Sequence, residues 1–117
     1  MKKIFYLSTC STCNKILSSF NDTKDFELRE IKSEAITESE IDAMKALSGS
    51  YESLFSRRAM KYKSMGLKDK NLSEEDYKKL ILDEYTFLKR PVVLAENDIF
   101  IGNSKKVVEA MQSFFAE

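Results

Sequence analysis

Histidine and tryptophan are both absent from this chain of 117 residues. The lack of imidazole excludes Ser-His-Asp and Cys-His catalysis, histidine-ligated metals and histidine proton shuttles, because each needs a group that titrates near neutrality. Cysteine is then the main side chain whose pKa the surrounding protein can bring into that range. There are only two cysteines, Cys10 and Cys13, and the search for chemistry begins with them.

An excess of either charge is also missing, since 19 Lys and Arg residues balance 19 Asp and Glu residues. No global field favours an acidic partner, so we predict no direct nucleic-acid contact and no membrane binding. No apolar run approaches the ~18 to 20 residues of a membrane span. We therefore expect a soluble cytoplasmic protein, and the length fits a single domain over residues 1–117.

Periodicity predicts the order β-α-β, then helices, then β-β-α. Strands are predicted over residues 3–7, 26–31, 92–95 and 99–101, and helices over 14–20, 38–47, from 51 to near 66, from 73 to 85, and over 107–115. The first two strands are expected to be parallel through a right-handed crossover, and the last two to form an antiparallel hairpin. This order predicts an α/β fold with a mixed four-stranded sheet and a helical insertion at about 36–86, between the second and third strands.

Cys10 stands between a predicted strand and a predicted helix. Unpaired backbone N–H groups and the positive end of the helix dipole meet at such a point and stabilise a thiolate. The pKa of Cys10 is therefore predicted to fall below its ordinary value, with the hydroxyls of Ser11 and Thr12 as further donors. Cys13 lies on the same helical face, within disulfide reach.

Other interpretations of the two cysteines stay open. They could be small core hydrophobes that happen to be neighbours. A structural zinc site needs about four ligands, and with two thiols and no histidine it would have to form between molecules. A purely stabilising disulfide would close too small a loop to restrict the unfolded chain much. Redox chemistry is the favoured interpretation, and no bound metal or cofactor is predicted.

Three arginines and the single proline are further candidates. Arg90 would present a planar donor fork to a thiolate or an oxyanion, although a solvated surface arginine is the alternative. Pro91 precedes a predicted strand, where a trans proline at a sheet edge is the alternative. The adjacent Arg57 and Arg58 would by themselves more often form a solvated face than an anion site.

Taken together, these segments resemble the arsenate reductase family of the glutaredoxin-coupled type and its relatives, the Spx-type transcription regulators. The similar segments are residues 6–17 with the Cys-Ser-Thr-Cys loop, 54–58 through 67, 87–93 with the Arg-Pro-Val-Val run, and 101–104 before the final helix. Their spread over nearly the whole chain makes the resemblance specific, since an isolated Cys-x-x-Cys motif would be weak.

The resemblance implies a thioredoxin-like fold in which Pro91 is cis and Arg90 lies close to the Cys10 sulfur. It implies that Cys10 attacks a small oxyanion or disulfide substrate, that Arg90 holds the oxyanion or lowers the thiol pKa, and that Arg58, or neighbouring Arg57, supplies another cation. Ser11, Thr12, Arg58 and Pro91 form the predicted substrate-binding site beside Cys10 and Arg90. Glutathione with glutaredoxin, or thioredoxin, would act as the external reductant and partner.

Two positions depart from the typical reductases. Asn103 stands where the family has a further arginine, and Cys13 stands where the typical reductases have serine and the Spx-type regulators have cysteine. The second departure favours a redox-active Cys10–Cys13 disulfide with Cys13 as the resolving thiol. Such a pair suits an oxidoreductase, our first interpretation, or a redox-sensing regulator that acts by binding RNA polymerase.

Overall fold

The computed structural model describes residues 1–116 as two compact units. One unit combines Met1–Glu34 with the C-terminal part that begins at Arg90, and the other is Ala35–Lys89. The predicted insertion of about 36–86 nearly coincides with the second unit. Within the described residues, no helix has the length and apolar character needed to cross a membrane.

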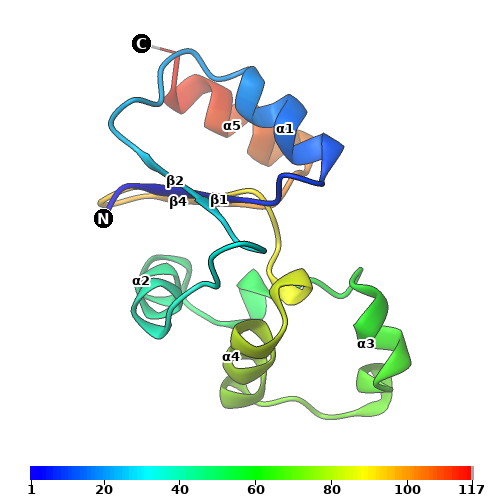
Figure 1. Cartoon of the computed structure of the whole chain (residues 1–117). Coiled ribbons are helices and arrows are strands. Elements are labelled where there is room, and N and C mark those ends of the chain that lie inside the picture. Colours follow the sequence, from blue (N-terminus) through cyan, green and yellow to red (C-terminus); the bar gives the residue numbers. More distant parts are fainter. Residues whose placement is uncertain (117) are drawn as a thin grey trace. The chain divides into compact units, whose positions relative to one another are not determined.

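The first unit contains a mixed sheet of four strands in the order β2-β1-β3-β4 (Figure 1). The strands are β1 (Lys3–Tyr6), β2 (Glu27–Glu30), β3 (Val92–Leu94) and β4 (Ile99–Ile101). β1 pairs in parallel with β2 and antiparallel with β3, and β3 pairs antiparallel with β4. The predicted parallel crossover and the predicted hairpin are both confirmed.

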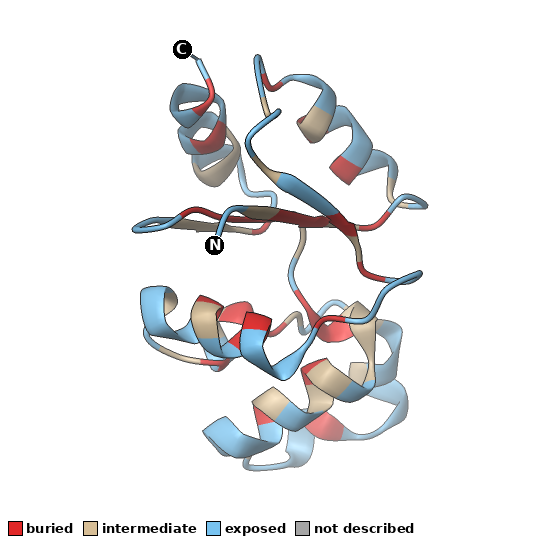
Figure 2. Ribbon diagram, turned by 60° about the vertical axis from the view of Figure 1, so that its left-hand side comes forward, coloured by how far each residue is buried: buried red, intermediate tan, exposed pale blue. Residues whose placement is uncertain are grey.

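Helices α1 (Ser11–Ser18) and α5 (Lys105–Phe114) lie over the same face of this sheet (Figure 1). Their inner faces join the sheet in one apolar core, whose buried members are Ile4, Ile16, Phe20, Val93, Met111 and Phe115. The rings of Phe20 and Phe115 stack with centroids 4.6 Å apart. Figure 2 shows the central strands buried and the outer faces of both helices exposed. This packing fixes the start of α1 against the end of β1.

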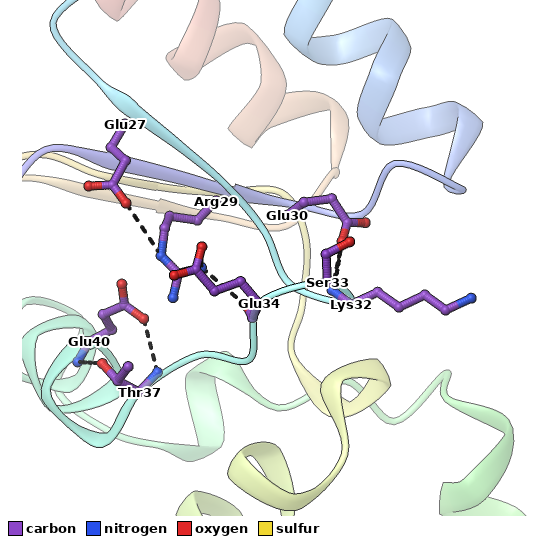
Figure 3. Close-up of polar contacts among 8 residues, drawn as sticks. All are labelled: Glu27, Arg29, Glu30, Lys32, Ser33, Glu34, Thr37 and Glu40. Atoms are coloured by element: carbon purple, nitrogen blue, oxygen red, sulfur yellow. Dashed lines mark hydrogen bonds and ion pairs between the residues drawn. The ribbon is translucent and has the colours of Figure 1, made fainter.

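Strand β2 reverses the usual burial of its residue types, because Leu28 is 52% exposed whereas Arg29 is buried. The Arg29 guanidinium lies over the Phe5 ring and pairs with the carboxylates of Glu27 and Glu34, at 3.6 and 3.2 Å (Figure 3). A buried arginine is tolerated when its charge is paired in this way. The alternating sequence therefore predicts the strand correctly, although its buried arginine could not be recognised from the pattern.

The second unit is helical. It comprises α2 (Glu38–Ser48), α3 (Met60–Ser64), α4 (Glu74–Asp83) and three single-turn 3-10 helices, η1 (Glu52–Leu54), η2 (Leu67–Asp69) and η3 (Tyr85–Phe87). The predicted starts of α2 and α4 are confirmed. Thr37 and Glu40 form a capping box at α2 (Figure 3), and Ser73 and Asp76 form another at α4.

The helical stretch predicted from residue 51 to near 66 is wrong in one respect, because it is broken into η1 and α3. Phe55 instead forms an antiparallel bridge with Leu88, and the Ser56 N–H donates to the Phe87 carbonyl at 2.6 Å. The ring of Phe55 also stacks on that of Phe87 at 5.0 Å. These contacts, made with residues distant in the sequence, hold the backbone extended between the two short helices.

Candidate active site

The two cysteines lie where β1 passes into α1. Cys10 is the N-cap residue of α1, with extended backbone angles of φ −93° and ψ 109°, and Cys13 lies in the first turn. The Cys10 N–H donates to the Leu7 carbonyl at 3.0 Å and its carbonyl accepts from the Asn14 N–H at 3.1 Å, so the loop passes directly into the helix. Both cysteines are free thiols, Cys10 partly exposed and Cys13 buried.

The pKa of Cys10 lies below its ordinary value. Partial burial by itself would raise it, but hydrogen bonds from the backbone N–H and the thiol of Cys13, the positive charge of Arg90 and the backbone N–H of Thr12 together outweigh that cost. The two backbone donors, from Thr12 and Cys13, are among the unpaired N–H groups that every helix N-terminus offers. The predicted acidity of Cys10 is confirmed, with backbone donors identified at the sulfur.

The pKa of Cys13 shifts in the opposite direction, to about 11. Burial is the main cause, and the hydrogen bond to Cys10 and the negative charge on that sulfur raise the pKa further, against the lowering effects of the Leu7 backbone and Arg90. One thiol of the pair is therefore ready to act as a nucleophile, while the other keeps its proton and donates it in a hydrogen bond.

The segment before β3 brings a cation to these sulfurs. The Arg90–Pro91 peptide bond is cis, as the family resemblance implies. The charge of Arg90 lowers the pKa of both thiols, which is consistent with the expected position of Arg90 near Cys10. The segment is held by its neighbour in the sheet, because the Gly102 N–H donates to the Pro91 carbonyl at 2.9 Å and the Asn103 amide donates to the Arg90 carbonyl at 3.3 Å.

The remaining predicted site residues have separate positions. Ser11 and Thr12 begin α1, and both are exposed beside Cys10. Arg57 and Arg58 belong to the second unit, in the loop before α3. Arg57 bonds to Glu52 at 2.8 Å and to the Tyr77 hydroxyl at 3.0 Å, whereas the exposed Arg58 has its N–H bonded to the Ser56 hydroxyl. A role for Arg58 in substrate binding stays a prediction.

Two residues that sequence reasoning missed contact the cysteine loop. The Ser8 N–H donates to the Glu30 carboxylate at 2.8 Å, and the Ser8 carbonyl accepts from the Asn14 side-chain amide at 2.8 Å. Glu30 ends the strand parallel to β1, and parallel strands present their carboxyl ends at one edge of a sheet. This rule could have identified Glu30 from the sequence, because it places the end of β2 beside the loop that follows β1.

Within residues 1–116, no group of three or more His, Cys, Asp or Glu side chains is arranged to hold a metal ion. The arrangement instead offers an acidic thiol, a second thiol in hydrogen-bond contact with it, and a guanidinium whose charge acts on both. Chemically, this set can attack an electrophilic centre through sulfur, stabilise the negative charge of an oxyanion, and then exchange the first sulfur bond for a disulfide.

Comparison with known proteins gives one family. A family model described as the ArsC family matches residues 5–111. A comparison with curated proteins finds no match.

Solved structures from several bacteria share the fold. An ArsC-family-related protein from Bacteroides fragilis is 24% identical, with a TM-score of 0.78 over 94% of this chain and 96% of that chain. A possible arsenate reductase from Streptococcus mutans is 26% identical, with a TM-score of 0.72 over 90% and 92%. An arsenate reductase from Vibrio cholerae is 14% identical, with a TM-score of 0.74 over 96% and 95%.

Proposed function

The chain belongs to the ArsC family, whose members have a thioredoxin-like fold, and from this premise we propose that it is a thiol-dependent oxidoreductase of the arsenate reductase type. The observation that carries the proposal is the hydrogen-bonded contact of two thiols at the N-terminus of α1, where the pKa of Cys10 is lowered and that of Cys13 is raised, with the charge of Arg90 acting on both. Cys10 is the nucleophile, Cys13 is the resolving thiol, and Arg90 is the cation that receives the oxyanion.

The first step is the attack of the Cys10 thiolate on the arsenic atom of arsenate. A sulfur–arsenic bond forms, and one arsenate oxygen leaves as water after taking up protons. The Arg90 guanidinium stabilises the negative charge on the remaining oxygens, as a planar donor fork does for oxyanions generally. Ser11 and Thr12, exposed at the start of α1, and Arg58 are proposed as further contacts for the substrate.

The second step is the attack of Cys13 on the Cys10 sulfur. A disulfide forms, the sulfur–arsenic bond breaks, and its electron pair stays on arsenic, so that As(V) is reduced to As(III) and arsenite leaves. Part of the raised pKa of Cys13 comes from the charge on Cys10. Bonding of Cys10 to arsenic takes the charge off the sulfur itself, which removes this contribution to the raised pKa of Cys13 at the stage when its thiolate is needed.

An external thiol must then reduce the disulfide. Glutathione with glutaredoxin, or thioredoxin, supplies the two electrons, and the enzyme needs no bound cofactor. The test is arsenate-dependent NADPH oxidation by the purified protein, assayed separately with glutathione, glutaredoxin and glutathione reductase, and with thioredoxin and its reductase. Activity in at least one system is expected, and none is expected from Cys10→Ser.

The Cys10 adduct can be resolved by Cys13 or by an external thiol such as glutathione, and Cys13→Ser distinguishes these two routes. With Cys13 as the resolving thiol, this variant loses thioredoxin-coupled turnover and accumulates Cys10 bound to glutathione after exposure to oxidised glutathione, because the intramolecular thiol of high effective concentration is gone. Intact-mass analysis reads the adduct directly. Equal adduct levels in the native protein and the variant would exclude Cys13 from resolution.

The same pair of thiols could serve a redox-sensing regulator. A native protein that is inactive with both reductant systems and retains RNA polymerase on an affinity column would support that second function and contradict the first. The column is run with oxidised and with reduced protein, since a sensor binds its partner in only one of the two states.

A further inference from the structure

The loop that leads to Cys10 is held by side chains from outside it. Both polar backbone groups of Ser8 are bonded to side chains, the N–H to Glu30 and the carbonyl to Asn14, each at 2.8 Å. The first partner lies at the end of β2 and the second in α1. The peptide units on either side of Ser8 are thus attached to α1, which follows the loop, and to β2, the neighbour of β1 in the sheet.

Glu30 joins this loop to a second turn. One carboxylate oxygen, Oε2, accepts the Ser8 N–H. The other, Oε1, accepts the N–H groups of Lys32 and Ser33 at 2.9 and 2.7 Å (Figure 3). The backbone bonds from Ser8 and Ser33, helped by the side-chain hydroxyls of the same two residues, lower the pKa of Glu30 to about 2 against an opposing effect of burial. The carboxylate is therefore charged near neutral pH, and it acts as a fixed acceptor.

The register of the sheet places this acceptor. Tyr6 of β1 is paired with Glu30 of β2, and the Ile31 N–H donates to the Tyr6 carbonyl at 3.0 Å. A side chain at the end of β2 is therefore beside the first residues after β1. A loop held on both sides of one residue leaves little freedom to the next two, and the second of these is the N-cap, Cys10.

From these contacts we propose that Glu30 and Asn14 are positioning residues for the redox thiol: together they fix the Ser8 peptide units and so keep the Cys10 sulfur at the N–H groups of Thr12 and Cys13 that stabilise its thiolate. The inference rests on the proposed function only in treating Cys10 as the reactive thiol. Its readout is thiol ionisation, which is measured without arsenate, so the failure of one proposal is distinguishable from the failure of the other.

The test variants are Glu30→Gln and Asn14→Ala. Glutamine has a single acceptor oxygen, and the side facing two donors, the N–H groups of Lys32 and Ser33, favours that oxygen. The amide NH₂ then faces the Ser8 N–H, and the backbone bond to the loop is lost. Asn14→Ala removes the other bond with no change of charge, at a helical position where alanine is well tolerated.

The pKa of Cys10 is read from the pH dependence of iodoacetamide labelling of the reduced protein, with peptide mapping to separate Cys10 from Cys13. We expect the pKa to rise by about half a unit to one unit in each variant, which lowers the thiolate fraction at a pH below the pKa by up to about three- to tenfold. In the double variant the rise in the pKa of Cys10 is expected to be smaller than the sum of the two single rises, because both changes release the same residue, Ser8. Glu27→Gln on the same strand and Ser18→Ala on the same helix are the matched controls, with no expected change.

The sign of the shift separates positioning from electrostatics. Removing the negative charge of Glu30 would by itself make a nearby thiol more acidic, whereas loss of positioning makes Cys10 less acidic. An unchanged or lowered pKa in Glu30→Gln, or a native pKa in Asn14→Ala, overturns the proposal. Circular dichroism establishes whether each variant is folded. If Glu30→Gln does not fold, the pKa of Cys10 in Asn14→Ala decides between the two outcomes.

Discussion

At the scale of single residues, the two sulfurs of the Cys-Ser-Thr-Cys motif show how much a shift of one helical turn changes chemistry. Cys10 caps α1 and receives N–H groups, while Cys13 is enclosed by the core and donates a hydrogen bond. Burial opposes ionisation at both positions, and only at Cys10 do the donors and the charge of Arg90 exceed it. The difference in pKa follows from this difference in environment.

Selective alkylation tests that difference. Only the thiolate reacts, so labelling of each cysteine increases as the pH rises through its pKa. Because the pKa of Cys10 is lowered and that of Cys13 is raised to about 11, iodoacetamide at pH 6 to 7 is expected to modify Cys10 at least about tenfold faster. Mass spectrometry of tryptic peptides gives the two rates, and faster labelling of Cys13 would reverse the assigned roles.

Asn103 provides a test of the oxyanion site. Its amide bonds to the Arg90 carbonyl, at a position where the reductases that the sequence resembles have an arginine. Asn103→Arg is expected to lower the KM for arsenate about three- to tenfold, because a guanidinium fork strengthens oxyanion capture. The NADPH-coupled assay measures KM and kcat together, and Asn103→Ala is the control for the lost amide. A KM equal to that of the control would contradict the inherited geometry.

These residues also mark how far the sequence could predict the site. The low pKa of Cys10 depends on its place at the start of one helix, so strand-helix periodicity was enough to predict it. Glu30 and Asn14 act through strand pairing and loop geometry, which no local pattern contains. The buried Arg29 escaped for a similar reason, since the carboxylates that pair with it are defined only by the folded strand and the turn after it.

At the scale of elements, helices with complete caps were predicted most accurately. The capping boxes at Thr37 and Ser73 define the starts of α2 and α4 within the sequence itself. By contrast, α3 has no side-chain cap and no buried residue, and the segment before it is held extended by a bridge to Leu88. Its boundaries depend on contacts far along the chain, which explains why one continuous helical stretch was predicted there.

A substitution at the first cap tests this account. Thr37→Ala removes the side-chain acceptor of the Glu40 N–H, at 3.1 Å, and leaves that donor without its cap. The free energy of unfolding is expected to fall by about 1 kcal/mol, measured by urea denaturation. Ser113→Ala, at an exposed position within α5, is the matched control and is expected to change stability by less than about 0.5 kcal/mol. Equal effects would show that the cap contributes nothing specific.

At the scale of the whole molecule, the chain leaves the sheet after β2, forms a helical unit and returns at β3. Each unit contains about half of the chain, and units of that size are marginally stable alone. We therefore expect the chain to unfold as a single domain.

The composition supplies separate probes for the two units. Tyr51, Tyr62, Tyr77 and Tyr85, four of the five tyrosines, lie in the helical unit, while the buried Cys13 lies in the other. Tyrosine fluorescence and Cys13 labelling are expected to give the same midpoint in guanidinium chloride. Ile81→Ala, which removes a buried side chain from α4, should lower both midpoints, at a cost of roughly 2 to 5 kcal/mol. Separate midpoints, or a shift seen by one probe alone, would indicate two independent domains.

The antiparallel pairing of β1 with β3 also means that two paired strands are synthesised at different times. Ile4 pairs with Val93, so a strand made at the start of translation can form this pairing only after a strand near the end of the chain has been made. Cys10 and Cys13 leave the ribosome early, while Arg90, whose charge contributes to the low pKa of Cys10, emerges only after the whole helical unit. During synthesis the nascent chain therefore lacks the contribution of Arg90, and we expect Cys10 to reach its full acidity only when the completed chain closes the sheet.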